Sequence, residues 1–543
     1  MPLNRKQASP GASHRRDLWR VSVIATLLFL ALLLGTYPLT DFDVWWHLRS
    51  GELILQNRAV PRVDVFTYSN AGRPWIDIYW FFQIIMALLY RAGGASALVI
   101  VKALAAVGLV AFTLGARRRD AALGPAVVFW IPGLILLSGR LNERPELFSL
   151  LFLSGFLVVL GQANERPRRL WLLPLLQILW VNSHGFFMLG PLLWAALAAD
   201  VGLQRLKKRD VPTDLMRPLA MVGPALILSC FLNPYGWDVF RLFLEQFRKL
   251  ASSDLYRANI GELRSIGDFI SLMGFNNPYL LAFFVVLVFG LASFVWAGLH
   301  HRFSVFRALI FGGATYLGWQ ATRNSGFFTL ISAMVFLGNL DDTAQAPTVA
   351  PVPRRGRRTP PEKPKPQRRT EPVLLGALAL ALLAVASGRL YAWAGEGRTI
   401  GLGERPNWFA HESCAFLARP DMPERMVAFN LSQAGVCIAH AGETRKQFID
   451  PRLEVNSEET FARYLAALRG LWGGSTDWEN ALQIDRSRPE EIPALLVERG
   501  ILSRVIDRLM HDPQWRCVHA DPVATVFVDA GFAEARGLAA VSP

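Results

Sequence analysis

The sequence predicts a polytopic α-helical membrane protein with about 11 to 13 transmembrane helices, followed by a soluble α/β domain at the C-terminal end. Composition excludes an ordinary soluble domain, because 52% of the 543 residues are hydrophobic and only 18% are charged. Long apolar runs recur from residue 21 to residue 393. Beyond residue 394 the apolar residues fall in short pieces, as they do in soluble domains.

A transmembrane helix needs an apolar run that can cross about 30 Å of hydrocarbon. The first such run follows a basic segment, residues 1–20, and shows no small-residue cleavage pattern, so we interpret it as a retained span with residues 1–20 in the cytoplasm. Residues 21–340 are predicted to form a multispan membrane domain whose first outer loop covers residues 40–75. The predicted spans, including one after this domain, are residues 21–39, 95–115, 121–139, 146–161, 170–183, 186–204, 217–233, 278–299, 305–320, 325–340 and 373–393.

A further apolar run at residues 76–90 is short, and the positive-inside rule helps to decide whether it crosses. If it does not cross, the basic clusters near Arg117, Arg166, Arg205 and Arg302 all fall on the cytoplasmic side. This arrangement has eleven spans and places the C-terminal region outside. If the run does cross, every later loop changes sides of the membrane and several basic clusters move outward. A count of one or two more spans is therefore the alternative.

Residues 341–372 form a basic, proline-rich linker before the last predicted span. The stretch from Pro351 to Pro372 carries eight Arg or Lys, two Glu and seven Pro, so it cannot bury a core and is expected to be a cytoplasmic tether. The net charge of +14 does not indicate nucleic-acid binding. The basic residues lie in short loops between apolar runs, and this pattern orients a membrane protein.

Residues 394–543 are predicted to form an extracytoplasmic α/β domain. The segments MVAFNL, KQFID and ATVFVD have the composition of strands, whereas we interpret SEETFARYLAALRG and EIPALLVERG as helical. Cys414, Cys437 and Cys517 lie in this domain, and Cys230 lies in a predicted span. One disulfide among the three is compatible with the sequence, but the odd cysteine left over argues against a disulfide framework.

Polar residues gather at one end of the predicted spans. In the eleven-span arrangement, the outer ends carry DFDVWWH, GRLNERPE, NSHG, NPYGWD and TRNSG. Ionisable groups at membrane depth are costly and tend to face a cavity or one another. Five such segments at one leaflet predict a single polar cavity open to the outside. The candidate site residues in these segments are Asp41, Asp43, Trp46, His47, Glu143, Arg144, His184, Tyr235, Arg323 and Asn324.

Several of these residues also have a purely structural interpretation. Asp41 can cap the helix that begins near Val44, because Asp is favoured at N-cap positions. Trp46 fits an aromatic belt at the membrane interface, and the Asn-Pro-Tyr-Gly stretch around Tyr235 fits a turn at a helix end. Arg323 is harder to explain without a partner or an anion, because it is a lone arginine between two adjacent spans.

Two carboxylates and several arginines at an outer membrane surface fit the transfer of a sugar from a lipid-linked phosphate donor. One carboxylate would remove a proton from the acceptor hydroxyl, and the cations would stabilise the phosphate that leaves. A lipid-linked donor also explains why the polar residues lie at helix ends.

The order of these features resembles the GT-C superfamily of integral-membrane glycosyltransferases: an acidic motif after the first span, an interfacial helix, many spans and a C-terminal outer domain. The resemblance is closest to bacterial multispan membrane proteins labelled as glycosyltransferases, which share segments such as DFDVWWHLRSGELIL, ERPELFS, NSHGFFMLG, LNPYGWDVF and TRNSGFF. It extends to FIDPRLEV and DPQWRCVHADPVATVFV and so covers most of the chain. The superfamily's first-loop acidic motif maps onto Asp41 and Asp43, although an adjacent Asp-Glu pair is usual where this chain has D-F-D.

The resemblance implies a GT-C-like fold and an inverting glycosyltransferase. It would move a sugar from a polyprenyl-phosphate donor to an extracytoplasmic acceptor, which would be a glycan, a lipid or a protein. The alternative is a non-catalytic envelope polysaccharide assembly factor with the same fold. The expected location is the bacterial inner (plasma) membrane, with the lipid bilayer, the donor and the acceptor as partners.

Asp41 is the expected base, and Asp43 is expected to be a helper or a ligand of a divalent cation such as Mg²⁺ or Mn²⁺. Two geometries are open for this pair. If Phe42 continues an extended strand, the two carboxylates point to opposite sides. If the loop turns at Phe42, they can converge on one ion.

The other candidate residues are expected to bind substrate. Phosphate contacts are expected from His47 and from Arg144 or Arg323. Trp46 and Tyr235 offer surfaces for a sugar ring. The remaining expected substrate-binding residues are Glu143, His184 and Asn324.

Overall fold

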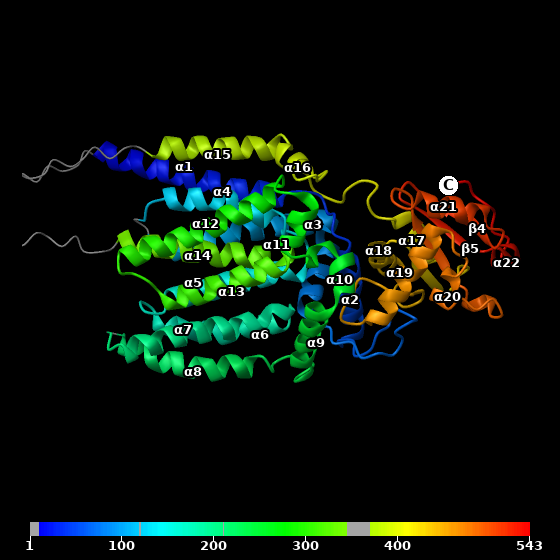
Figure 1. Cartoon of the computed structure of the whole chain (residues 1–543), viewed down its shortest axis with the longest axis horizontal. Helices are drawn as coiled ribbons and strands as arrows, with labels where there is room; N and C mark the ends of the chain where they lie inside the picture. The colour runs from blue at the N-terminus through cyan, green and yellow to red at the C-terminus, as the bar shows by residue number, and fades with distance from the viewer. Residues whose placement is uncertain (1–9, 119–120, 210, 345–369) are drawn as a thin grey trace, which may run out of the picture.

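The computed structural model describes residues 10–118, 121–209, 211–344 and 370–543. Figure 1 shows a bundle of helices, a layer of short helices across one end of the bundle, and a C-terminal domain beyond that layer. Residues 1–9 of the predicted cytoplasmic segment and residues 345–369 of the predicted linker lie outside the described residues. Their predicted positions therefore stay predictions.

Four helical stretches among the described residues are long and apolar enough to span a membrane, namely Asp17–Gly35, Trp80–Ala116, Gly185–Leu206 and Pro278–Leu299. Each predicted apolar run overlaps a bundle helix, although the last run, residues 373–393, extends beyond its helix into the short helix α16 (Arg389–Trp393). The predicted number of 11 to 13 spans stays a prediction. The bundle helices are α1 (Pro10–Gly35), α3 (Trp80–Ala116), α4 (Gly124–Ser138), α5 (Pro145–Gly161), α6 (Leu172–Val181), α7 (Leu189–Leu206), α8 (Thr213–Ser229), α12 (Pro278–Leu299), α13 (Val305–Gln320), α14 (Ser325–Ala344) and α15 (Glu371–Ala386).

The short apolar run at residues 76–90 is separated from the following span by a break in the helix, where Gly93 and Gly94 leave the helical conformation. Most of it forms the first part of α3, which is kinked near Gly94. Gly94 has a φ of +61°, a backbone conformation that glycine adopts without strain. The first part of α3 packs so closely on α2 (Asp43–Asn57) that a β-carbon at Gly51 would collide with the Gln83 carbonyl. This contact with an end-layer helix favours the arrangement in which the run does not cross.

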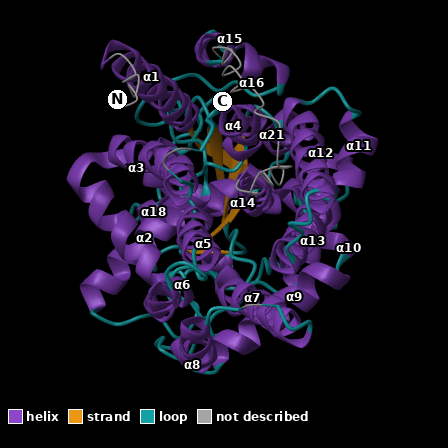
Figure 2. Cartoon of the chain, turned by 90° about the vertical axis from the view of Figure 1, so that its left-hand side faces the viewer, coloured by secondary structure: helices purple, strands orange, loops and turns teal. Residues whose placement is uncertain are grey.

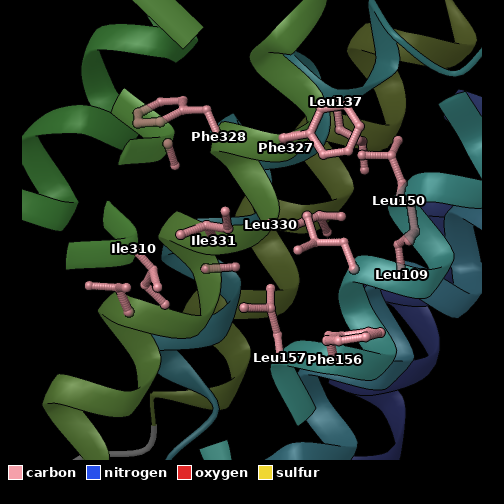
Figure 3. Packing of buried hydrophobic residues seen from close by; sticks show 14 of the residues in the cluster. Leu109, Leu137, Leu150, Phe156, Leu157, Ile310, Phe327, Phe328, Leu330 and Ile331 are labelled. Carbon is pink, nitrogen blue, oxygen red and sulfur yellow. The ribbon is translucent and has the colours of Figure 1, made fainter. Parts of the chain in front are cut away.

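The helix α14 lies at the centre of the bundle. Its buried residues cover every side of the helix, so protein surrounds it. Figure 3 shows side chains of α14 packing against side chains of α4, α5 and α13. The start of α14 is therefore firmly held, and so is the short helix η4 (Thr322–Asn324) that precedes it. The α14 residues labelled in Figure 3 are Phe327, Phe328, Leu330 and Ile331.

The end layer connects the bundle to the C-terminal domain. Besides α2, it contains α9 (Asp238–Ser252), α10 (Asp254–Asn259), η3 (Gly261–Leu263) and α11 (Ile266–Met273). Figure 1 shows α9 lying across the ends of the bundle helices. Near the end of α9, the Lys249 ammonium donates to the carbonyl oxygens of Leu453 at 2.6 Å and Asn456 at 2.5 Å. This contact ties α9 to the C-terminal domain.

The C-terminal domain is built on one five-stranded mixed sheet, which Figure 2 shows beyond the bundle helices. The strands lie in the order β2-β1-β3-β5-β4; β1 is parallel to β2 and β3, and β5 is antiparallel to β3 and β4. The strands are β1 (Arg425–Ala428), β2 (Lys446–Gln447), β3 (Ala494–Glu498), β4 (Trp515–Ala520) and β5 (Ala524–Asp529). The helices are α17 (His411–Leu417), α18 (Leu431–Ala441), α19 (Glu458–Gly473), α20 (Trp478–Leu482), α21 (Ser503–His511) and α22 (Ala530–Ala535).

The helical interpretation of EIPALLVERG is wrong. Ala494–Glu498 is β3, the central strand of the sheet, and its first four residues are buried between β1 and β5. A short, continuously apolar run has no periodicity that separates a buried strand from a buried helix. Cys414 and Cys437 form a disulfide between α17 and α18, while Cys517 is a buried free thiol. One disulfide is thus present without a framework.

The predicted first outer loop, residues 40–75, lies against the edge of this sheet. Thr67 pairs in parallel with Gln447 of β2. The Gln447 amide donates to the Phe66 carbonyl at 2.8 Å, and the Tyr68 amide donates to the Gln447 carbonyl at 2.9 Å. The loop therefore acts as a short extension of the sheet and holds the domain against the bundle.

Candidate functional site

Arg144 lies where three carboxylates meet. It directly precedes α5 and has an extended backbone, as expected for a residue before a proline. Its guanidinium contacts Asp41 (Nε to Oδ2, 2.5 Å), Asp43 (Nη2 to Oδ2, 3.1 Å) and Glu262 (Nη1 to Oε2, 3.0 Å). The segment after α1, the start of α5 and η3 are thus joined at one cation.

The D-F-D motif turns, so its two carboxylates approach the same partner. Phe42 has φ −76° and ψ −26°, a helical conformation. The Oδ1 atom of Asp41 accepts the N–H of Asp43 at 2.9 Å, which makes an Asx turn before the helix. The N-cap position belongs to Phe42, so the predicted capping role of Asp41 is replaced by this turn. Of the two predicted geometries, the converging one is present.

Glu262 of η3 is shared by three arginines. Besides Arg144, it contacts Arg140 at 3.3 Å, and the Arg323 Nη1 atom lies 4.0 Å away. Arg140 also pairs with Glu146 at 2.6 Å. Burial raises the pKa of Glu262, but the three guanidinium groups lower it more, so the pKa lies well below its usual range. Glu262 is therefore ionised at neutral pH and offsets part of the local positive charge.

A cavity of about 480 Å³ opens beside these charges. Its walls come from α2, the start of α5, η2 (Gly185–Met188), α9, the end of α13, η4 and a segment of the C-terminal domain, Pro451–Glu454. The bundle, the end layer and the C-terminal domain therefore all contribute to one site. The predicted residues that line it are Asp43, Trp46, His47, Arg144, His184, Arg323 and Asn324.

Three predicted residues do not line the cavity. Asp41 is covered by its guanidinium partner. Glu143 forms a fully buried ion pair of 2.7 Å with Lys102 of α3, so its carboxylate is already neutralised away from the cavity. The Tyr235 hydroxyl donates to the Pro61 carbonyl at 2.8 Å, which holds the ring against the first loop. Glu143 as a substrate contact and Tyr235 as a sugar platform are therefore not supported by the geometry.

The two histidines are neutral rather than cationic. Burial lowers the pKa of His47 well below its usual value and that of His184 to about 3. The amide nitrogen of Gln83 lies 3.3 Å from His47 Nδ1, which leaves the other ring nitrogen as the N–H donor. His184 Nδ1 lies 2.8 Å from the Ser149 hydroxyl. The predicted phosphate contact at His47 is thus limited to a hydrogen bond without charge.

Asp43 is the motif carboxylate that borders the cavity. Burial raises its pKa to about 6, although Arg144 opposes this shift. A carboxyl group with this pKa is largely ionised at pH 7 and is more basic than an ordinary aspartate. These two properties suit a group that accepts a proton during a reaction.

The carboxylates do not fit the divalent cation expected at Asp43. A hard cation such as Mg²⁺ needs several oxygen ligands that point at the metal. Here Asp41, Asp43 and Glu262 all point at the Arg144 guanidinium, which already supplies the positive charge. Within the described part of the chain, no group of three or more His, Cys, Asp or Glu side chains has a geometry that could hold a metal ion.

Sequence analysis missed Glu262, Tyr79 and the segment Pro451–Glu454, all of which line the cavity. Glu262 lies in a three-residue helix without a recognisable motif. The segment Pro451–Glu454 lies in FIDPRLEV, one of the stretches that carry the family resemblance, so the sequence did contain a sign that this segment matters. Its place in the cavity depends on how the C-terminal domain docks, and no local pattern encodes that.

Solved structures share this architecture. The archaeal oligosaccharyltransferase AglB from Archaeoglobus fulgidus, in complex with an inhibitory peptide and a dolichol-phosphate, matches with a TM-score of 0.55 and 11% identity, over 89% of this chain and 70% of that one. An A. fulgidus oligosaccharyltransferase tethered with an acceptor peptide containing the NVT sequon also matches with a TM-score of 0.55 and 11% identity, over 94% and 74% of the two chains. The chain has the GT-C fold.

The other comparisons add little to this result. ArnT from Cupriavidus metallidurans bound to undecaprenyl phosphate, a further GT-C glycosyltransferase, matches with a TM-score of 0.46 and 12% identity over 97% of this chain and 99% of that one. No protein-family model matches the sequence, and no curated protein matches it. At these identities the likeness describes the GT-C fold, and the chemistry has to be argued from the residues of the site.

Proposed function

We propose that this GT-C protein is an inverting glycosyltransferase that moves a sugar from a polyprenyl-phosphate carrier to an extracytoplasmic acceptor. One observation carries the proposal: a single cavity joins the carboxylate of Asp43 and the guanidinium of Arg323 to an apolar wall. These are the parts needed for a proton acceptor, a phosphate contact and a lipid chain. The dolichol-phosphate bound to AglB, which has the same fold, supports a polyprenyl donor.

In the proposed reaction, Asp43 accepts the proton of the acceptor hydroxyl. The hydroxyl oxygen attacks the anomeric carbon from the face opposite the phosphate. The bond between that carbon and the phosphate oxygen breaks, and the polyprenyl phosphate leaves with the bonding electron pair. This single displacement inverts the configuration at the anomeric carbon. Arg144 holds Asp43 in place through the 3.1 Å contact.

Arg323 is the better phosphate contact of the two arginines. Arg144 already has three carboxylate partners, so its charge is compensated. Among the described residues, Arg323 has Glu262 as its ion-pair partner, at the longer distance of 4.0 Å. Its Nε atom is shielded from solvent and has no hydrogen-bond partner among the residues that the structure describes. Asn324 beside it also borders the cavity, but its amide nitrogen already donates to the Leu317 carbonyl at 2.9 Å, so the donor that a phosphate would satisfy here is Arg323 Nε.

The apolar wall suits the lipid part of the donor. Phe243 and Phe247 of α9 and Tyr316 and Leu317 of α13 line the cavity. Phe247 and Tyr316 are also exposed at the surface of the bundle end. A prenyl chain can therefore extend from the cavity along these side chains into the surrounding hydrocarbon. Trp46 provides the aromatic face for the sugar ring at the polar end.

We also propose that the protein lies in the bacterial inner membrane, with eleven spans and the C-terminal domain outside the cytoplasm. Two observations support this topology. The basic loop clusters fall on one side in the eleven-span arrangement. The Cys414–Cys437 disulfide fits an oxidising compartment, since disulfides are rare in the cytosol.

The test is a gene deletion followed by analysis of lipid-linked sugars. We expect one polyprenyl-phosphate sugar to accumulate, because its consumption has stopped. Wild-type protein should reverse the accumulation and Asp43→Asn should not. The matched control is Asp238→Asn: Asp238 is likewise the first residue of an end-layer helix, but it is exposed and does not line the cavity.

Two outcomes would contradict the proposal. Full reversal by Asp43→Asn, at wild-type protein levels, would remove the assigned base. An unchanged set of lipid-linked sugars in the deletion strain would show that the protein does not consume such a donor and would favour the non-catalytic assembly factor.

A further inference from the structure

The segment Pro451–Glu454 brings the C-terminal domain into the cavity. It follows β2 and is held by a fully buried cluster around Arg452. The Arg452 guanidinium contacts Asp450 at 2.6 Å and Asp64 of the first loop at 2.5 Å. It also lies over the ring of Trp75, at 4.4 Å from the ring centre. The segment is therefore fixed both to its own domain and to the first loop.

Two polar atoms of this segment have no hydrogen-bond partner in the part of the chain that the structure describes. The Nη1 atom of Arg452 and the Oε1 atom of Glu454 are both shielded from solvent, and neither has a hydrogen-bond partner among the described residues. Both side chains border the cavity. Buried donors and acceptors are rarely left unpaired, because desolvation without a hydrogen bond is costly. Two such atoms on one cavity wall indicate a ligand that supplies both an acceptor and a donor.

The surroundings narrow the chemistry of that ligand. Trp46, which also lines the cavity, packs in the same apolar cluster as Val455, next to the segment. An aromatic face beside polar groups suits a sugar ring, which has apolar C–H faces and hydroxyl groups at its edge. Burial raises the pKa of Glu454 to about 7, so near neutral pH this carboxyl group can accept or donate a hydrogen bond.

We infer that Arg452 and Glu454 form a subsite for the hydroxyl groups of a sugar. Arg452 Nη1 is the hydrogen-bond donor of this subsite, and Glu454 Oε1 is its hydrogen-bond acceptor. This inference rests on the proposed function for the identity of the ligand but not for the existence of the subsite. The hydroxyl groups belong either to the sugar of the donor or to a sugar of the acceptor. The C-terminal domain then selects the sugar, while the end of the bundle carries the transfer chemistry.

The test measures binding of methyl glycosides of common hexoses and N-acetylhexosamines to the full-length protein in lipid nanodiscs. We expect at least one glycoside to bind, and Glu454→Ala to weaken its binding by about tenfold or more, since a hydrogen bond to a charged group is lost. Glu454→Gln keeps the shape and should weaken binding less. Glu534→Gln, an exposed glutamate of the same domain, is the matched control and should change nothing.

Competition separates the two sources of the sugar. Displacement of the glycoside by a sugar-bearing undecaprenyl phosphate, but not by bare undecaprenyl phosphate, assigns the subsite to the donor. Simultaneous binding of the glycoside and the sugar-bearing carrier assigns it to the acceptor. Thermal unfolding of each variant shows whether the fold is intact.

The inference is overturned if no glycoside binds, or if Glu454→Ala binds every glycoside as tightly as the wild type does. The Asp43→Asn variant separates this result from the proposed function. Glycoside binding that persists in Asp43→Asn and depends on Glu454 supports the subsite even where no transfer is measured. Transfer that is lost in Asp43→Asn but insensitive to Glu454→Ala supports the reaction and removes the subsite.

Discussion

Asp41 and Asp43 are two residues apart, yet they have different surroundings. Asp41 is occupied on both oxygens, by the Asp43 amide and by Arg144, and does not line the cavity. Asp43 lines the cavity and keeps a raised pKa despite its contact with the same arginine. We therefore propose Asp43 as the base in place of Asp41, which the sequence suggested, and we propose that Asp41 orients Arg144.

We expect Asp41→Asn and Asp43→Asn to differ in transfer rate. An amide at position 43 cannot accept a proton, so we expect a loss of about a hundredfold or more. An amide at position 41 keeps the Asx turn and leaves Arg144 with two carboxylates, so the loss should be smaller. The measurement is the initial transfer rate of both variants at matched protein levels. A larger loss for Asp41→Asn would restore the original assignment.

The pKa of Asp43 also predicts a pH dependence. The base works in its ionised form, and burial raises its pKa to about 6, so activity should rise as pH increases through 6. At pH 5 only about a tenth of the carboxyl groups would be ionised. The measurement is a rate profile from pH 5 to pH 8. Asp43→Asn should lack this rise, and a wild-type rate that is flat over this range would contradict the assignment.

Arg323 gives a test of phosphate recognition. A guanidinium can bind two phosphate oxygens at once, whereas an ammonium is a point charge. Arg323→Lys should therefore fold and express normally but lose much of the transfer rate, and Arg323→Ala should lose more. Expression and rate are measured for both variants. An active Arg323→Lys protein would show that this arginine is an interfacial anchor, a role that lysine fills equally well.

At the scale of elements, the contact between the first loop and the C-terminal domain sets the shape of the cavity. Asp64 uses its carboxylate both for the turn of its own loop, through the amides of Phe66 and Thr67, and for Arg452 of the domain. The side chains of Arg452 and its carboxylate partners are fully buried, so a missing member would leave a buried charge without its counter-charge. The loop and the domain should therefore move as one unit.

Removal of this arginine should destabilise that unit. Arg452→Ala would leave Asp64 and Asp450 buried without a counter-charge, and breaking a buried ion pair in this way costs about 3–5 kcal/mol. The measurement is chemical denaturation of the full-length protein. Arg488→Ala, at an exposed ion pair in the same domain, is the control and should cost less than about 1 kcal/mol. Equal stability of the two variants would show that the buried cluster does not hold the domain.

At the scale of the whole molecule, the polar residues of the site lie at the bundle end that faces the C-terminal domain. The bundle helix α7 runs away from the site and ends at Leu206. Figure 1 shows α7 extending toward the end of the bundle that lies away from the C-terminal domain. The loop tip near Ala71 and the domain surface near Ser475 are exposed. These positions allow the topology to be tested.

We expect Ala71→Cys and Ser475→Cys to react with a membrane-impermeant thiol reagent in intact cells. Lys207→Cys, at the opposite end of the bundle, should react only after the membrane is opened. Cys230 and Cys517 are buried and should give little background. Labelling of Lys207→Cys alone in intact cells would reverse the orientation and place the cavity in the cytoplasm.

The sequence by itself determined the membrane class, the positions of the bundle helices and the mixed character of the C-terminal domain. Apolar runs are local signals, and in lipid a backbone must satisfy its hydrogen bonds within the segment, so a long apolar run has to be a helix. The outer-end motifs also marked most of the cavity residues, because ionisable groups at such depth need a polar space.

Only the tertiary structure decided which of these residues border the cavity and which pair with other side chains. It paired Glu143 with Lys102, turned Tyr235 toward the first loop, and showed that Asp43 rather than Asp41 borders the cavity. It also brought Glu262 and Glu454 to the site. Each of these facts depends on a contact between segments more than forty residues apart, or on the direction of a side chain at a turn. The spacing of hydrophobic residues along the sequence contains neither kind of information, because it predicts which residues are buried but not which residues they contact.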